Sequence, residues 1–452
     1  MKTPTTVNIA DVIDNHSIGA FQVGLFALCA ACLIMDGFDV QAVGYTAPEI
    51  IRQLHISASH MAPVTTAGLV GVLVGSLLFS IVADRIGRRP VLIAATFCFS
   101  ILTLLTGRAQ SVAQLVAIRF LAGVGLGGIM PNVVALVGEY SPRRLRVFLM
   151  VLISNGFNVG AMSAGFIAAR LMPEFGWPSV FYFGGVIPLL IGVLMLFALP
   201  ESLQFLALRG ERMDAVGRWL RRIDPNSAAL GAAYVIPEKP ERGGPLVHLF
   251  REGRATGTTL LWIINFMNLL NLYFLSSWLT TVFRDAGYSL TNAVYIGTTL
   301  QAGGTIGTLV LGWLVGRRGF DRILPISFAV ACVSIGLIGQ PALSVGFLFV
   351  TVFVAGFCVL GGQGALNALA ATFYPTDLRS TGIGFALGVG RLGAIVGQPI
   401  AGLLLAHHWA ARELFLAAAL PALIATVAMF SLRWFTKLQA SVSAGQTAAI
   451  AH

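Results

Sequence analysis

The chain has 452 residues, of which 56% are hydrophobic and only 11% are charged, whereas an ordinary soluble domain has roughly 25% charged residues. A water-soluble fold cannot bury that much apolar surface, so the composition excludes a soluble enzyme and predicts a protein solvated by lipid. The formal net charge of +10 would suit a nucleic-acid-binding protein, but we attribute it to membrane topology because of where the basic residues lie.

The apolar residues form twelve runs, and a helix needs about 20 residues to cross ~30 Å of hydrocarbon at ~1.5 Å per residue. In chain order the predicted spans are 21–45, 61–83, 90–106, 112–137, 147–171, 179–199, 258–282, 293–315, 323–338, 345–371, 381–406 and 414–435. The third and the ninth are short for a span. The pattern predicts an all-α membrane protein with twelve transmembrane helices.

The basic residues indicate the orientation of the chain. When the loops are numbered alternately, 22 of the 29 Lys and Arg residues fall on the side that carries both chain ends. By the positive-inside rule we expect a multi-pass protein of a bacterial inner membrane with both termini cytoplasmic. The first 20 residues have no basic region before a short apolar core, so they do not predict a cleaved signal peptide.

The first span contains two acidic residues, Asp36 and Asp39. An ionised carboxylate at mid-bilayer costs at least ~2.5 kcal/mol, so a pair of them one helical turn apart indicates a function. The i, i+3 spacing places both on one face, and Arg119 in the fourth span reaches a similar depth from the same side. We predict that Asp36, Asp39 and Arg119 form a proton-coupling group, in which movement of Arg119 switches a carboxyl between its protonated and ionised forms. The alternative is a static ion pair that fixes helix packing.

Charged residues gather in the loops and helix ends on the predicted cytoplasmic side. An acid and several arginines there can latch helix ends in one conformation and release them in another, which makes a bistable gate. Ordinary basic loops that obey the positive-inside rule are the alternative. The gating residues that we predict are Asp84, Arg85, Arg88, Arg89, Glu139, Arg317 and Arg318.

The second half contains an arginine in an apolar span, Arg391, near the predicted midplane of the membrane. A bidentate anion would neutralise its guanidinium, so we predict that Arg391 binds a substrate carboxylate; pairing with an acid of the other half or with backbone carbonyls is the alternative. Further polar and aromatic side chains could line the same site or could join helices to one another. The remaining predicted substrate-binding residues are Phe38, Asn268, Asn271, Tyr273, Trp278, Gln301 and Gln363.

The spans divide into two sets of six on either side of one long polar stretch. We expect an N-terminal six-helix bundle at 1–199, a cytoplasmic linker at 200–257, and a C-terminal bundle with a short tail at 258–452. The two halves resemble each other at an offset of 232 to 233 residues, which places Gly160 opposite Gly393 and Asn158 opposite Arg391. Such an internal repeat predicts two pseudo-symmetric bundles, the arrangement of the major facilitator fold.

Several motifs carry a family resemblance. The loop 84–90, Asp-Arg-Ile-Gly-Arg-Arg-Pro, resembles the loop signature of the major facilitator superfamily, although Ser80 and Gly316 depart from that pattern. The segment 119–127, which starts at Arg119 and is rich in glycine, resembles the fourth-helix signature of the same superfamily. Together with Asp36-Gly37-Phe38-Asp39, the residues after the tenth span and Arg391, these motifs resemble the aromatic acid:proton symporter family over nearly the whole chain.

This resemblance implies proton-coupled uptake, by alternating access, of an aromatic carboxylic acid such as 4-hydroxybenzoate or protocatechuate. Uptake of another organic acid or a sugar is an alternative, and a transporter-like membrane sensor is one from a different class. We find no nucleotide-binding loop, metal-ligand cluster or nucleophile–base pair in the sequence, so we expect no enzyme activity, no cofactor and no metal. The expected partners are an aromatic carboxylate, protons and the lipid bilayer; we expect no nucleic acid, and a monomer.

Overall fold

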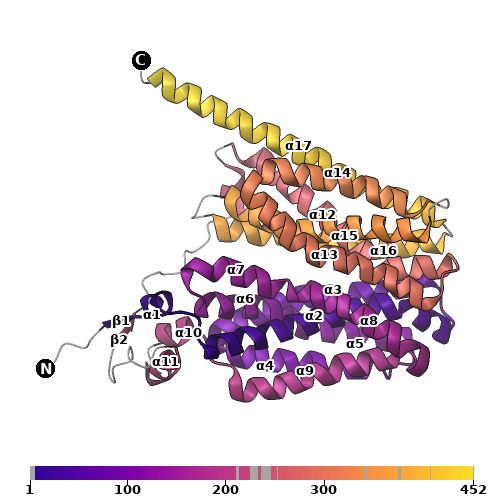
Figure 1. The fold of residues 1–452 in the computed structure, drawn as a ribbon, viewed down its shortest axis with the longest axis horizontal. Coiled ribbons are helices and arrows are strands. Elements are labelled where there is room, and N and C mark those ends of the chain that lie inside the picture. Colours follow the sequence, from indigo (N-terminus) through magenta and orange to yellow (C-terminus); the bar gives the residue numbers. More distant parts are fainter. Residues whose placement is uncertain are drawn as a thin grey trace. The chain divides into compact units, whose positions relative to one another are not determined.

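The computed structural model describes residues 6–209, 213–223, 233–235, 246–251, 253–340, 344–374, 378–407 and 409–450. Almost all of these residues are helical, which confirms the predicted all-α class (Figure 1). The chain divides into two compact units: unit 1 contains Met1–Thr46 and Ala67–Pro240, and unit 2 contains Ala47–Thr66 and Glu241–His452. The middle of the predicted linker, around Pro237 and Gly243, lies outside the described residues.

The first half of the chain forms eight longer helices, several of them paired end to end within one span. They are α2 (Ala20–Leu54), α3 (Met61–Ile86), α4 (Arg88–Thr106), α5 (Val112–Gly127), α6 (Ile129–Tyr140), α7 (Arg143–Ser154), α8 (Gly156–Phe175) and α9 (Pro178–Ala198). Within unit 1, α4 packs on α5 and α9, and α8 packs on α9. The helices satisfy their own backbone hydrogen bonds, as lipid requires.

Short elements gather at one end of the unit 1 helices (Figure 1). They are the strands β1 (Thr6–Asn8) and β2 (Ala233–Val235) and the helices α1 (Ile9–Asn15), α10 (Leu203–Arg209) and α11 (Met213–Leu220). The two strands pair in parallel, with Val7 opposite Tyr234. The start of the chain is thereby joined to the polar segment that follows the sixth span.

The second half forms six long helices. They are α12 (Ala255–Asp285), α13 (Leu290–Arg318), α14 (Phe320–Ile338), α15 (Val345–Phe373), α16 (Arg379–Ala406) and α17 (Ala411–Ile450), preceded by the 3-10 helix η2 (Leu246–Phe250). A further 3-10 turn, η1 (Ala58–His60), precedes α3. In unit 2, α13 packs on α15, α12 on α16 and α17, and α14 on α15 and α17.

Among the described residues, eleven helical segments are long and apolar enough to cross a membrane, and both short predicted spans are among them, as the 19-residue helices α4 and α14. The helix α13, which contains the predicted eighth span, is long but less apolar. Its glycines replace bulky side chains because α13 lies very close to α15. A Cβ atom added to Gly303 or Gly307 would lie 2.2 or 2.3 Å from the carbonyl oxygens of Phe353 and Phe357. Small residues allow such close helix approach in membranes.

The predicted internal repeat is visible in the helix crossings. An added Cβ at Gly160 in α8 would lie 1.8 Å from the carbonyl oxygen of Ile34 in α2, and one at Gly393 in α16 would lie 2.2 Å from that of Phe266 in α12. Both members of the second pair lie 232 or 233 positions after those of the first. An added Cβ at Gly71 in α3 would lie 2.1 Å from the carbonyl oxygen of Phe120 in α5, and the contact of Gly303 with Phe353 repeats this crossing in unit 2. The two six-helix sets therefore use the same close contacts, which supports the register of the repeat.

Candidate functional site

Asp39 of α2 and Arg119 of α5 form a buried bidentate ion pair in unit 1. Arg119 Nη1 donates to Asp39 Oδ1 at 3.1 Å and Nη2 donates to Asp39 Oδ2 at 2.6 Å. Thr103 of α4 donates a third hydrogen bond to Asp39 Oδ1 at 2.5 Å. The two charged side chains are 0% and 4% exposed, and the guanidinium also lies 5.9 Å from the centre of the Phe181 ring. Charge and hydrogen bonds together satisfy a carboxylate that lipid would otherwise exclude.

The residues beside Asp39 on α2 are also buried. Asp36 is 6% exposed. An added Cβ at Gly37 would lie 1.9 Å from the carbonyl oxygen of Phe157 in α8, so the motif has a glycine where α2 and α8 cross. Phe38 is 1% exposed and packs on Phe183 of α9, with ring centroids 5.6 Å apart. Its predicted role in substrate binding stays a prediction.

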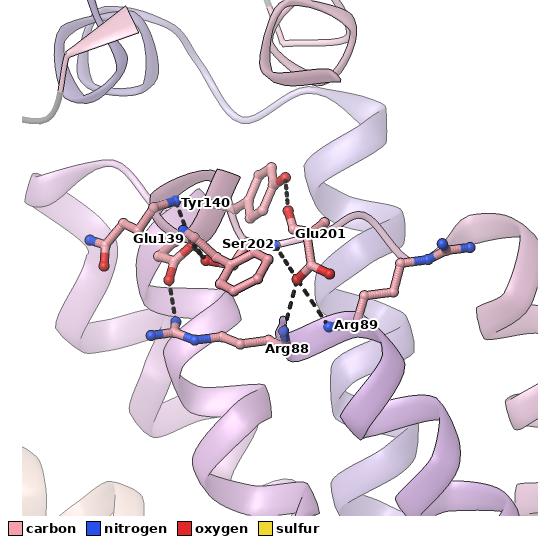
Figure 2. Close-up of polar contacts among 8 residues, drawn as sticks. Arg88, Arg89, Glu139, Tyr140, Glu201 and Ser202 are labelled. Carbon is pink, nitrogen blue, oxygen red and sulfur yellow. Dashed lines mark hydrogen bonds and ion pairs between the residues drawn. The ribbon is translucent and has the colours of Figure 1, made fainter. Parts of the chain in front are cut away.

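A second cluster joins α4, α6 and the segment after α9 (Figure 2). Arg88 forms an ion pair with Glu139, whose other carboxylate oxygen accepts from the Ser202 hydroxyl at 2.7 Å. The Tyr140 hydroxyl donates to the backbone carbonyl of Glu201 at 2.8 Å. The structure thus brings together two of the predicted gating residues, Arg88 and Glu139.

Sequence reasoning gave Glu201 no role, yet its carboxylate caps the N-terminus of α4. Glu201 Oε1 accepts from the backbone N–H groups of Arg88 at 2.8 Å and Arg89 at 3.1 Å (Figure 2). These donors have no partner within the helix, and a negative charge at a helix N-terminus is favourable. Gly87, with φ of 104°, precedes the helix, and a Cβ there would lie 2.4 Å from Glu201 Oε2. In the sequence, the sign of this helix start was Gly87 followed by Arg88 and Arg89.

Most of the other predicted gating residues are exposed on their units, and Arg89, beside Arg88, is partly buried. Asp84 and Arg85 are exposed, and Arg89 donates from its side chain to the Leu196 carbonyl at 2.6 Å. In unit 2 the Arg317 guanidinium lies 4.2 Å from the centre of the Trp313 ring, and Arg318 is exposed. A gating role for these residues stays a prediction.

Unit 2 contains a ladder of side-chain amides between α12 and α15. Asn268 Nδ2 donates to Gln363 Oε1 at 2.7 Å, and Gln363 Nε2 donates to Asn367 Oδ1 at 2.8 Å and to Asn265 Oδ1 at 3.4 Å. Two of the predicted substrate-binding residues, Asn268 and Gln363, are therefore in direct contact. They can also serve as the interhelical hydrogen bonds that hold α12 against α15.

Further along α12, aromatic and amide side chains form a second polar contact. Trp278 Nε1 donates to Gln398 Oε1 of α16 at 2.9 Å, and Gln398 Nε2 donates to the Tyr273 carbonyl at 3.2 Å. Gln301 of α13 donates to the Ser276 hydroxyl at 3.1 Å. Arg391 lies on α16 and is partly buried. These predicted residues thus lie on α12, α13 and α16.

Removal of the Glu201 carboxylate should loosen the first turn of α4. In a Glu201→Ala variant we expect the amide hydrogens of Arg88 and Arg89 to exchange about tenfold faster, which corresponds to ~1.4 kcal/mol. Hydrogen–deuterium exchange with mass spectrometry measures this. The matched control is Glu174→Ala, which removes an exposed carboxylate paired with Arg170. Equal exchange of the α4 amides in wild type and Glu201→Ala would contradict the capping role.

Comparison with known proteins identifies the family. The model of the Major Facilitator Superfamily matches residues 29–338 and 261–451. The chain is 37% identical to the 4-hydroxybenzoate transporter PcaK of Pseudomonas aeruginosa, over 94% of this chain and 95% of that one. It is 38% identical to the gallate transporter of Pseudomonas putida, again over 94% and 95%.

Solved structures agree on the fold. A bacterial homologue of the human lysosomal transporter Spinster, in an inward-facing and unoccupied conformation, superposes with a TM-score of 0.68 at 16% identity, over 93% of this chain and 98% of that one. The chain therefore belongs to the Major Facilitator Superfamily, in the branch that contains transporters of aromatic acids, and the resemblance seen in its sequence motifs is confirmed.

Proposed function

We propose that the protein takes up an aromatic carboxylic acid, such as 4-hydroxybenzoate or protocatechuate, together with protons by alternating access. The named relatives support the substrate class, because both transport hydroxylated aromatic acids. The observation that carries the proton coupling is the bidentate Asp39–Arg119 pair, buried within membrane-spanning helices. A membrane interior retains such charges at a cost, and proton-translocating proteins are a class that needs them.

The proton and Arg119 compete for the same carboxylate in this proposal. Ionised Asp39 holds the guanidinium through two hydrogen bonds, whereas a protonated carboxyl loses the charge that makes these bonds strong. Protonation would therefore release Arg119 from α2. Asp36, three residues earlier on α2 and 6% exposed, is the second proposed carrier. A static ion pair would hold α2 and α5 together without responding to pH.

The substrate is assigned to residues of unit 2. We assign its carboxylate to Arg391, because a guanidinium fork matches both oxygens of a carboxylate. Its ring is assigned to aromatic side chains of α12. The further lining residues proposed are Asn268, Asn271, Tyr273, Trp278, Gln301 and Gln363.

The proposal also includes the membrane, the orientation of the chain and the gate. The protein is a multi-pass membrane protein, and we propose that it lies in a bacterial inner membrane as a monomer with both termini cytoplasmic. The Arg88–Glu139–Glu201 cluster would then lie on the cytoplasmic side and act as part of the gate. The first bundle is assigned to 1–199, the linker to 200–257 and the second bundle to 258–452. We propose a transporter and no enzyme activity.

Neutralising the acids of α2 should uncouple uptake from the pH gradient. In proteoliposomes with an acidic exterior, we expect wild type to accumulate labelled 4-hydroxybenzoate. The Asp36→Asn and Asp39→Asn variants should each accumulate at least tenfold less, because asparagine carries no proton. Asp285→Asn, which changes an exposed acid, is the matched control. Accumulation by both α2 variants at the wild-type level would overturn the proton-coupling role.

Substitution of Arg391 should weaken substrate binding. A hydrogen bond to a charged group contributes ~1.5–3 kcal/mol, so we expect Arg391→Ala to bind the aromatic acid about 10- to 100-fold more weakly. Arg391→Lys should recover part of the loss, since lysine keeps the charge but not the fork. Isothermal titration calorimetry on purified protein measures the affinity, with exposed Arg412→Ala as the control. Unchanged affinity in Arg391→Ala would remove this assignment.

A further inference from the structure

The internal repeat places Asn271 of α12 at the position that Asp39 occupies in α2. Asn271 lies 232 positions after Asp39, the same shift that relates Phe266 to Ile34 at the glycine crossings. Asp36 corresponds in the same way to Asn268. The second unit therefore has amides where the first has carboxylates, and an amide side chain takes up no proton but keeps a donor and an acceptor.

The partners of Asp39 have no polar counterparts in unit 2. Arg119 corresponds to Val352 of α15 and Thr103 to Ile335 of α14, and both of these apolar side chains are 0% exposed. One contact in each unit supports this register. In unit 1, an added Cβ at Gly125 would lie 3.2 Å from the Ala95 carbonyl oxygen. In unit 2, the residues that correspond to Ala95 and Gly125 are Ser327 and Cys358, and the Ser327 hydroxyl donates to the Cys358 carbonyl.

One atom of the Asn271 side chain is without a partner. Asn271 is 1% exposed, and its Oδ1 atom accepts no hydrogen bond from any residue that the structure describes. By contrast, the side-chain oxygens of Asn265 and Gln363 in the amide ladder each accept a hydrogen bond. A buried carbonyl oxygen without a donor is costly, and in a native protein it points to an unassigned partner.

We propose that Asn271 Oδ1 accepts a hydrogen bond from a hydroxyl group on the ring of the transported acid. This inference rests on the proposed function and extends it to the choice among aromatic acids. A carbonyl oxygen needs a donor, and a phenolic hydroxyl supplies one, whereas a carboxylate supplies only acceptors. Asn271 would therefore determine specificity for hydroxylated rings, while the carboxylate binds elsewhere.

The separation of Arg391 and Asn271 along the helix axes suits a ligand that binds Arg391 with its carboxylate and Asn271 with its hydroxyl. Gly393 faces the Phe266 carbonyl and Gly397 faces the Leu270 carbonyl, so α16 and α12 run in the same direction and Arg391 lies at the level of Ile264. Asn271 is seven residues further along α12, or ~10 Å at ~1.5 Å per residue. A benzene ring with a carboxylate at one end, a hydroxyl at the other and one hydrogen bond of ~2.8 Å at each end spans a distance of that order.

The test compares two ligands that differ by one hydroxyl group, 4-hydroxybenzoate and benzoate, on purified full-length protein by calorimetry. We expect wild type to prefer 4-hydroxybenzoate, and Asn271→Leu to lower the ratio of the two affinities about tenfold. Leucine has nearly the shape of asparagine and removes the buried oxygen, so the melting temperature should hold or rise. Asn292→Leu, at an exposed position in α13, should keep the wild-type ratio.

Each outcome decides one level of the proposal. If wild type binds both acids with a ratio that Asn271→Leu leaves unchanged, the role of Asn271 is wrong and the proposed function stands. A wild-type protein that does not prefer 4-hydroxybenzoate over benzoate overturns the inference even if Asn271→Leu fails to fold. Binding of neither acid by wild type overturns the proposed function, and this inference with it.

Discussion

The pairing of Asp39 with Arg119 is the constraint from which the organisation of unit 1 follows. Neither charge is tolerable alone in a span, and loss of one partner from such a buried pair costs ~3–5 kcal/mol. The pair joins α2 to α5, and Thr103 adds α4 to the same carboxylate. Gly37, between the two acids in the sequence, allows α8 to cross α2 closely at this point. Any motion that separates α2 from α5 must therefore change the charge of a carboxyl or find the guanidinium another partner.

The two halves show how duplication of one helical frame permits two kinds of chemistry. The glycine crossings repeat with the same shift along the chain, and so do serine caps such as Ser111 at α5 and Ser344 at α15. The polar positions within that frame differ. In unit 1 they carry ionisable groups, which suit the proposed proton coupling, and in unit 2 they carry amides, which suit recognition of a neutral hydrogen-bonding group. The shared frame fixes where a polar side chain is placed, and its identity fixes what it can do.

The sequence was sufficient for the features that depend on periodicity and charge. Apolar run lengths predicted the helices, and the depths of Asp39 and Arg119 in their spans predicted that these two residues can meet. Features that depend on packing between distant segments were not accessible. The Glu201 carboxylate reaches α4 across more than 110 residues of chain, and the glycines Gly303 and Gly307 of α13 are explained by the close approach of α15. Likewise, the sequence alone does not show that the side-chain oxygen of Asn271 is buried without a hydrogen-bond donor; this requires the structure.

Proton coupling through α2 is tested most directly by observing the carboxyl groups themselves. Infrared difference spectra of the reconstituted protein, recorded on addition of 4-hydroxybenzoate at acidic pH, should contain the C=O stretching band of a protonated carboxyl group that changes on substrate binding. We predict that this band is lost in Asp36→Asn or in Asp39→Asn. A spectrum in which both variants retain the wild-type band, with the same response to substrate, would contradict proton transfer through these residues.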